Sequence, residues 1–206
     1  MLSLMGREIR DHIVFVAAPC VVSLLMIVVA IRGFVYGIEL MVFIPLTIIM
    51  LMSLVIFCVL GATQMYADRA NKVSALLGTL AVTRSRILAA RVLVGVLAIL
   101  AALAPFVVAI VILLKLFVPA AELVYGMTAE IFVTIFLAGL ACYCGGLAIG
   151  WTTSRVWVIM GGLLMIVAVV SIVYIKGFGP GAMAVLLAFI AATLLHVWHK
   201  FTSASI

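Results

Sequence analysis

Two short motifs hold the side chains that could bind a metal ion in this chain. Cys142 and Cys144 form Cys-x-Cys within an apolar stretch. Helix positions two apart point about 200° from each other, so both thiols reach one metal only if the helix unwinds. His196 and His199 can share a helix face, but they flank a tryptophan beside Lys200, as in an interfacial belt. The sequence therefore favours packing and interfacial roles over a metal site.

Motifs for catalysis are missing from the sequence. It contains no Gly-x-x-x-x-Gly-Lys phosphate loop, no His-Glu-x-x-His zinc helix and no Gly-x-Ser-x-Gly nucleophile elbow. No predicted membrane span has Asp, Glu or Lys near its centre, where an ion-coupled carrier usually needs one. We therefore expect no catalytic residue, no metal and no cofactor in this chain. An enzyme or a carrier that works alone is the weakest hypothesis.

The composition is that of a membrane protein. Of 206 residues, 69% are hydrophobic and 9% are charged, and the mean hydropathy is +1.55. A soluble domain needs about a quarter of its residues charged, so lipid must be the solvent here. The net charge of +6 fits cytoplasmic loops better than nucleic-acid binding. All four cysteines lie in apolar runs, and we expect no disulfide.

The apolar runs predict an all-α, polytopic membrane protein. A helix needs about 20 apolar residues to cross the hydrocarbon. We expect a single transmembrane domain, residues 1–206, with six predicted spans at about 13–31, 40–62, 92–116, 131–150, 156–175 and 182–198. Six spans place both termini on the same side.

The distribution of Lys and Arg predicts the orientation. Nine lie on the side of the termini and three on the other side, which places both termini in the cytoplasm. The longest cytoplasmic segment is then residues 61–91. The first group is Arg7, Arg10, Arg69, Lys72, Arg84, Arg86, Arg91, Arg155 and Lys200, and the second is Arg32, Lys115 and Lys176.

Two segments outside the spans have an amphipathic pattern. From Tyr66 to Leu80, apolar residues recur at helical spacing, which predicts a helix at the cytoplasmic membrane surface. Residues 2–11 predict an interfacial helix that leads into the first span. Periodicity leaves open whether the 61–91 segment docks a partner or only anchors the third span.

A series of short motifs runs through Asp68 to Arg91, DRANKVSALLGTLAVTRSRILAAR. A charged pair comes first, then a Leu-Leu pair, then Val-Thr-Arg, then Ile-Leu and a basic residue before the third span. This order resembles the cytoplasmic loop of type-2 ABC exporter permeases. Lys72–Val73 and Ala81 stand where that family usually has Gly-Thr and Pro.

The resemblance implies a coupling helix between the second and third spans. In that family this helix docks on a separate ATPase subunit, which binds ATP and Mg²⁺. Two ATPase copies and a second permease, as a homodimer or heterodimer, would complete the transporter. The residues that the resemblance assigns to ATPase docking are Asp68, Arg69, Lys72, Leu76, Leu77 and Arg84.

The resemblance also implies that the second and fifth spans line the substrate pathway. Each candidate residue fits helix packing as well. Gly146 and Gly150 form a small-xxx-small pair, which predicts close helix packing within or between subunits. The pathway candidates are Pro45, Thr47, Ser53, Ser171 and Tyr174.

The predicted function is therefore that of the membrane permease subunit of an ATP-driven ABC exporter in the prokaryotic cytoplasmic membrane, surrounded by lipid. The alternative is a scaffold or assembly factor that transports nothing and docks a soluble partner through residues 61–91. The apolar interior favours a hydrophobic or amphipathic cargo, and a lipid, a peptide, a drug-like molecule and haem all stay open.

Overall fold

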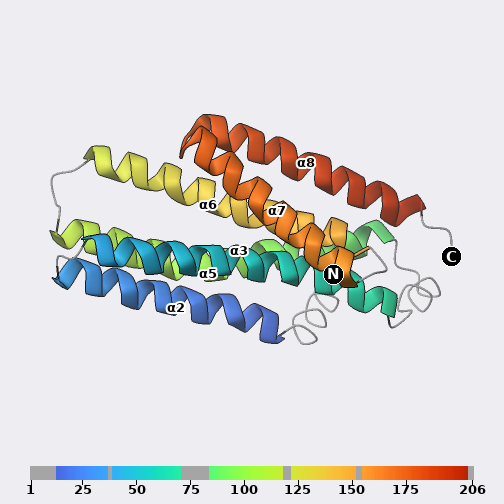
Figure 1. Ribbon diagram of the computed structural model, residues 1–206, viewed down its shortest axis with the longest axis horizontal. Helices are drawn as coiled ribbons and strands as arrows, with labels where there is room; N and C mark the ends of the chain where they lie inside the picture. The colour runs from blue at the N-terminus through green and yellow to red at the C-terminus, as the bar shows by residue number, and fades with distance from the viewer. Residues whose placement is uncertain (1–12, 37–38, 71–83, 118–121, 152–154, 204–206) are drawn as a thin grey trace.

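Helices make up the regular structure of the residues that the computed structural model describes, which are 13–36, 39–70, 84–117, 122–151 and 155–203 (Figure 1). The all-α prediction is thus confirmed for this part of the chain. The helices are α2 (Ile13–Tyr36), α3 (Glu39–Ala70), α5 (Arg84–Phe117), α6 (Glu122–Ile149), α7 (Arg155–Lys176) and α8 (Pro180–Ser203).

Five of these helices are long and apolar enough to cross a membrane, as judged over the described residues. Their apolar spans are Thr47–Tyr66, Arg86–Leu116, Gly126–Ile149, Val158–Lys176 and Pro180–Lys200. In α2 the apolar stretch found is the shorter Cys20–Arg32. The chain is therefore a multi-pass membrane protein, and a sixth span through α2 stays a prediction.

Three of the helices extend two turns or more beyond the predicted spans, and one of them is α6, which begins at Glu122 instead of near residue 131. The second span was expected to end near residue 62, but α3 continues to Ala70, and α5 begins at Arg84 instead of near 92. Their 32 and 34 residues correspond to about 48 and 51 Å, against about 30 Å of hydrocarbon. Both helices thus reach past the apolar layer. The rest of the predicted coupling helix and the predicted N-terminal helix lie outside the described residues.

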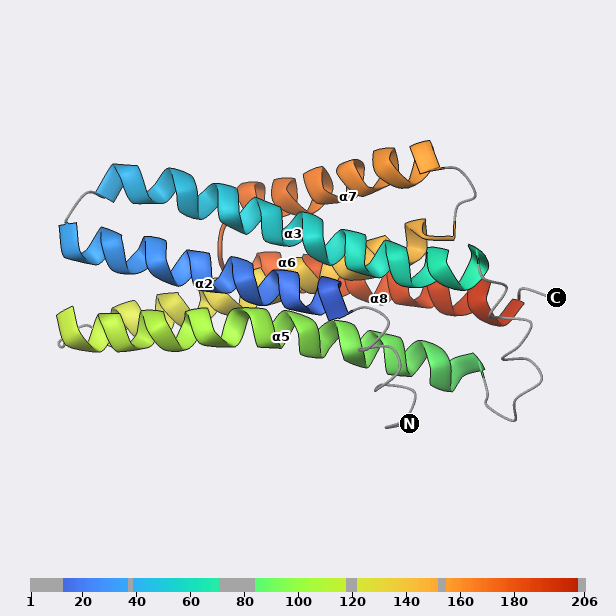
Figure 2. The same cartoon turned by 90° about the horizontal axis from the view of Figure 1, so that it is seen from below.

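Successive helices run antiparallel, and α6 lies at the centre of the bundle (Figures 1 and 2). It packs against α3, α5, α7 and α8, while α2 packs against α3 and α5. Figure 2 shows that α3, α6 and α8 end where α2, α5 and α7 begin. We call this the α3–α5 end, after Ala70 and Arg84. It brings together the two helix ends that flank residues 71–83.

The turn between α7 and α8 follows from its sequence. Gly177 has a φ of 70°, the left-handed conformation that often ends a helix and that glycine adopts without strain. Pro180 begins α8, where its missing N–H costs nothing. These two helices therefore form a tight hairpin at the break between the predicted spans 156–175 and 182–198.

The closest contact between helices joins α3 and α6. A Cβ atom on Gly146 would overlap the backbone carbonyl oxygen of Cys58, and one on Gly150 would lie 2.6 Å from the carbonyl oxygen of Ala62. The absence of side chains here lets the two backbones touch. The small-xxx-small pair thus packs within the chain, which resolves the alternative that the sequence left open.

Candidate functional site

An arginine is buried in the bundle near the α3–α5 end. Arg91 was predicted to lie in a cytoplasmic loop, and this prediction is wrong, because its side chain is only 2% exposed. It lies on α5 along the same helical stripe as the buried Leu88 and Val94. Its Nη1 atom lies 3.5 Å from the Sδ atom of Met65 on α3. A buried ionisable group in a membrane protein is costly and usually has a role.

Tyr143 of α6 joins this arginine to α3. Its hydroxyl oxygen lies 2.7 Å from Oε1 of Gln64 and 2.8 Å from the backbone carbonyl oxygen of Arg91. A hydroxyl has one hydrogen and cannot donate fully to both acceptors. Gln64 Nε2 is buried without a hydrogen-bond partner, so turning the amide over lets Gln64 donate to Tyr143 while Tyr143 donates to Arg91.

Two glycines create the space for this tyrosine. A Cβ on Gly95 of α5 would overlap the Tyr143 ring, and a Cβ on Gly61 of α3 would overlap the Tyr143 carbonyl oxygen. Three helices therefore meet at one side chain. We call Gln64, Arg91 and Tyr143 the polar junction. It ties the ends of α3 and α5, which flank residues 71–83, to the central helix α6.

Three of the predicted ATPase-docking residues lie at this end of the bundle. Asp68 and Arg69 belong to the last turn of α3, and Arg84 is the first residue of α5. Lys72, Leu76 and Leu77 lie outside the described residues. Asp68, Arg69 and Arg84 are thus only a few residues away, along the chain, from Gln64 or Arg91 of the polar junction.

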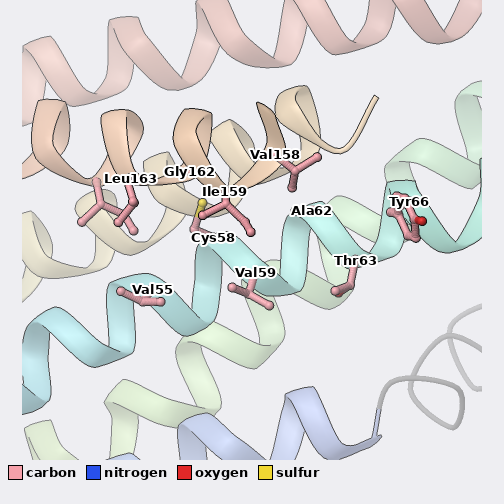
Figure 3. A pocket seen from close by; sticks show the side chains of 11 residues that line it. Val55, Cys58, Val59, Ala62, Thr63, Tyr66, Val158, Ile159, Gly162 and Leu163 are labelled. Carbon is pink, nitrogen blue, oxygen red and sulfur yellow. The ribbon is translucent and has the colours of Figure 1, made fainter. Parts of the chain in front are cut away.

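A groove lies between α3 and α7, the helices that correspond to the predicted second and fifth spans (Figure 3). Its volume is about 370 Å³. Nine of its lining side chains are apolar or glycine, and the only two hydroxyls are those of Thr63 and Tyr66. The lining residues are Val55, Cys58, Val59, Ala62, Thr63, Tyr66, Val158, Ile159, Gly162, Leu163 and Ile166.

The five pathway candidates from the sequence are not among these lining residues. Ser53 is buried and donates to the carbonyl oxygen of Met50 in its own helix at 2.6 Å. Thr47 is exposed on α3, Ser171 is partly buried on α7, and Tyr174 is 89% exposed. Pro45 belongs to α3, but its side chain lies outside the described part of the structure.

The cysteines and histidines do not form a metal centre in the described residues, where no group of three or more potential ligands gathers. Cys58, Cys142 and Cys144 are buried free thiols. His196 and His199 are exposed on α8. The groove is therefore suited to bind an apolar molecule, and the polar junction is suited to hold three helices in position.

Comparison with known proteins gives no match: no family model, no curated protein and no solved structure resembles this chain significantly. The class that the fold and site define is thus a multi-pass helical membrane protein with an apolar groove between α3 and α7.

Proposed function

We propose that this chain is the membrane permease subunit of an ATP-driven exporter of the type-2 ABC kind. Two copies, or one copy and a related permease, would work with two ATPase subunits in the prokaryotic cytoplasmic membrane. The observation that carries the proposal is the groove between α3 and α7. The resemblance of residues 68–91 implies a substrate pathway that is lined by these same two spans.

The extended ends of α3 and α5 would transmit movement of an ATPase subunit to the transmembrane helices. α3 and α5 reach past the apolar layer and flank residues 71–83, where an ATPase subunit would dock. The polar junction links both helix ends to α6. A displacement of residues 71–83 would thus be passed to three helices at once, while α7 is the least buried of the five apolar spans and is the helix best able to move relative to α3.

Purification from native membranes tests the proposal. The chain should bring down a soluble subunit that has a phosphate loop and hydrolyses ATP. Reversing both charges in Asp68→Lys with Arg69→Glu should lower the recovery of this subunit and the transport-coupled ATPase activity about tenfold or more, because like charges that face each other across an interface cost several kcal/mol.

A matched control reverses two charges at the other end of the bundle. Lys115 and Glu130 are both exposed, so Lys115→Glu with Glu130→Lys should leave ATPase binding unchanged. Equal loss in both double variants, or no loss in either, would count against docking at residues 68–84. A stoichiometric partner without a phosphate loop would favour the scaffold function instead.

A further inference from the structure

The length of the α3–α7 groove matches one half of a bilayer. Its α3 wall extends from Val55 to Tyr66, which is about 16 Å of helix. A single leaflet contributes half of the hydrocarbon layer, about 15 Å. Tyr66 also lies just before Asp68 and Arg69, the first charged residues after Glu39 in the sequence. The groove thus begins at the membrane boundary and ends near the middle of the bilayer.

Polarity is confined to one end of the groove. Tyr66 lies at the end near Val158, while Val55 and Leu163 lie toward the other end (Figure 3). The Thr63 hydroxyl donates to the Leu60 carbonyl oxygen at 3.0 Å, which leaves the Tyr66 phenol as the main polar group for a ligand. Tyrosine favours the membrane–water interface. The lining is therefore suited to a molecule with one polar end.

The volume of the groove decides which kind of molecule fits. A helix segment of the same length, about 10 Å across, occupies on the order of 1,300 Å³. The groove holds about 370 Å³, which is room for about a dozen groups the size of a water molecule. A helix from a second copy is thus too large to enter it, whereas a single hydrocarbon chain fits.

The groove is open toward the surrounding lipid. Ile159 and Leu163 line it and are also 64% and 54% exposed. On the other wall, Val55 and Val59 are partly exposed in the same way. A hydrocarbon chain can therefore move sideways from the bilayer into the groove without crossing a polar surface.

We propose that the α3–α7 groove binds one acyl chain of an amphiphile from the leaflet at the α3–α5 end, with the polar head beside Tyr66 and the methyl end beside Val55 and Ile166. The acyl-chain site rests on the geometry of the groove. Its use as a cargo site rests on the proposed function and narrows the cargo to amphiphiles with an acyl chain.

Photolabelling tests the site and its direction. The probe is palmitic acid with a diazirine either beside the carboxylate or near the methyl end, added to the purified protein in lipid nanodiscs. Mass spectrometry should find the first probe on peptides that contain Tyr66 or Val158, and the second on those that contain Val55 or Ile166. Labels spread evenly over exposed apolar residues such as Leu24 and Leu195 would overturn the proposal.

Two neighbouring residues of α7 give a matched pair of variants. Leu163→Trp places a bulkier side chain in the groove, whereas Leu164, which is 67% exposed, lies outside the lining. The Trp side chain fills space that the acyl chain would occupy and leaves that chain in the equally apolar bilayer, so Leu163→Trp should reduce labelling of the groove peptides severalfold. Leu164→Trp should label like the parent protein, and equal labelling of both variants would contradict the proposal.

The two proposals can fail separately. Selective labelling in a protein that recruits no ATPase would keep the acyl-chain site and remove its role in export. An ATPase that co-purifies with a protein labelled without selectivity would keep the proposed function and overturn the acyl-chain site.

Discussion

Helix α3 makes two contacts of opposite character, one on each side. Toward α6, Gly146 and Gly150 let the backbones touch, and the polar junction adds hydrogen bonds. Toward α7, bulkier side chains leave a groove, and α7 itself is little buried. Close small-residue packing favours a fixed contact in a membrane, where no hydrophobic effect drives helices together. We therefore expect the α3–α6 pair to be the rigid part of the bundle and the α3–α7 contact to be the part that opens.

The largest difference in stability is expected between two glycine-to-alanine variants, one in the α3–α6 contact and one in the α3–α7 groove. Gly146→Ala puts a Cβ on the backbone carbonyl of Cys58, whereas the Cβ of Gly162→Ala would lie 3.6 Å from the Cys58 Sγ, an ordinary contact. The first variant should lose about 3 kcal/mol of unfolding free energy in mixed micelles. The second should be unchanged or gain up to about 1 kcal/mol from helix propensity.

Gly126→Ala is a control for the general effect of the substitution on α6, because its Cβ would meet nothing within 4 Å. Equal stability of Gly146→Ala and Gly126→Ala would show that α3 and α6 are not in backbone contact.

An intermediate effect is expected at the polar junction. Tyr143→Phe keeps the ring above Gly95 but removes the hydroxyl that contacts Gln64 and Arg91. It should cost about 1–2 kcal/mol of stability, since it leaves buried polar groups without their partner. Tyr174→Phe also removes a phenolic hydroxyl, but from a side chain that is 89% exposed, and it should change the stability little. Thermal unfolding of both variants checks the difference, and similar losses would contradict the junction.

The same variant has a functional readout under the proposed function. In the complex with its ATPase, Tyr143→Phe should lower transport more than it lowers ATP hydrolysis, because the ends of α3 and α5 lose a tie to α6. A parallel fall of both rates would indicate a purely structural role.

The smallest effect is expected on the α7 side of α3. Thr63→Val removes a groove hydroxyl whose hydrogen bond goes to Leu60 of its own helix. Such local bonds contribute little to helix stability, so the unfolding free energy should stay within about 0.5 kcal/mol of the parent value. A loss as large as that of Tyr143→Phe would remove the contrast between the two sides of α3.

Much of the fold was predictable because apolar runs of membrane length have few other structures available to them. The breaks near Trp151 and Gly177 were placed within a few residues of the observed helix ends. The ends of α3 and α5 were missed, since charged residues such as Asp68 and Arg84 mark the edge of the hydrocarbon and not the end of the helix. The resemblance directed attention to the second and fifth spans, but the candidates chosen for polarity, such as Ser53, are not groove residues.

The polar junction could not be predicted in the same way. Charge counting treats every arginine as a loop residue, and Arg91 belongs to the bundle interior instead. A signal was present, because Arg91 falls on the stripe of Leu88 and Val94. Its partners Gln64 and Tyr143 come from distant parts of the sequence, and only the folded chain brings them together.

The most direct test of the account compares the two contacts of α3 while ATP is bound by the proposed ATPase partner. Spin labels on a cysteine-free background would report the α3–α7 distance from Val59 and Leu164 and the α3–α6 distance from Met52 and Val133, all four of which are exposed. With the co-purified ATPase, adding ATP should shift the α3–α7 distance and leave the α3–α6 distance unchanged. An unchanged α3–α7 distance, or a shift between α3 and α6, would contradict the account.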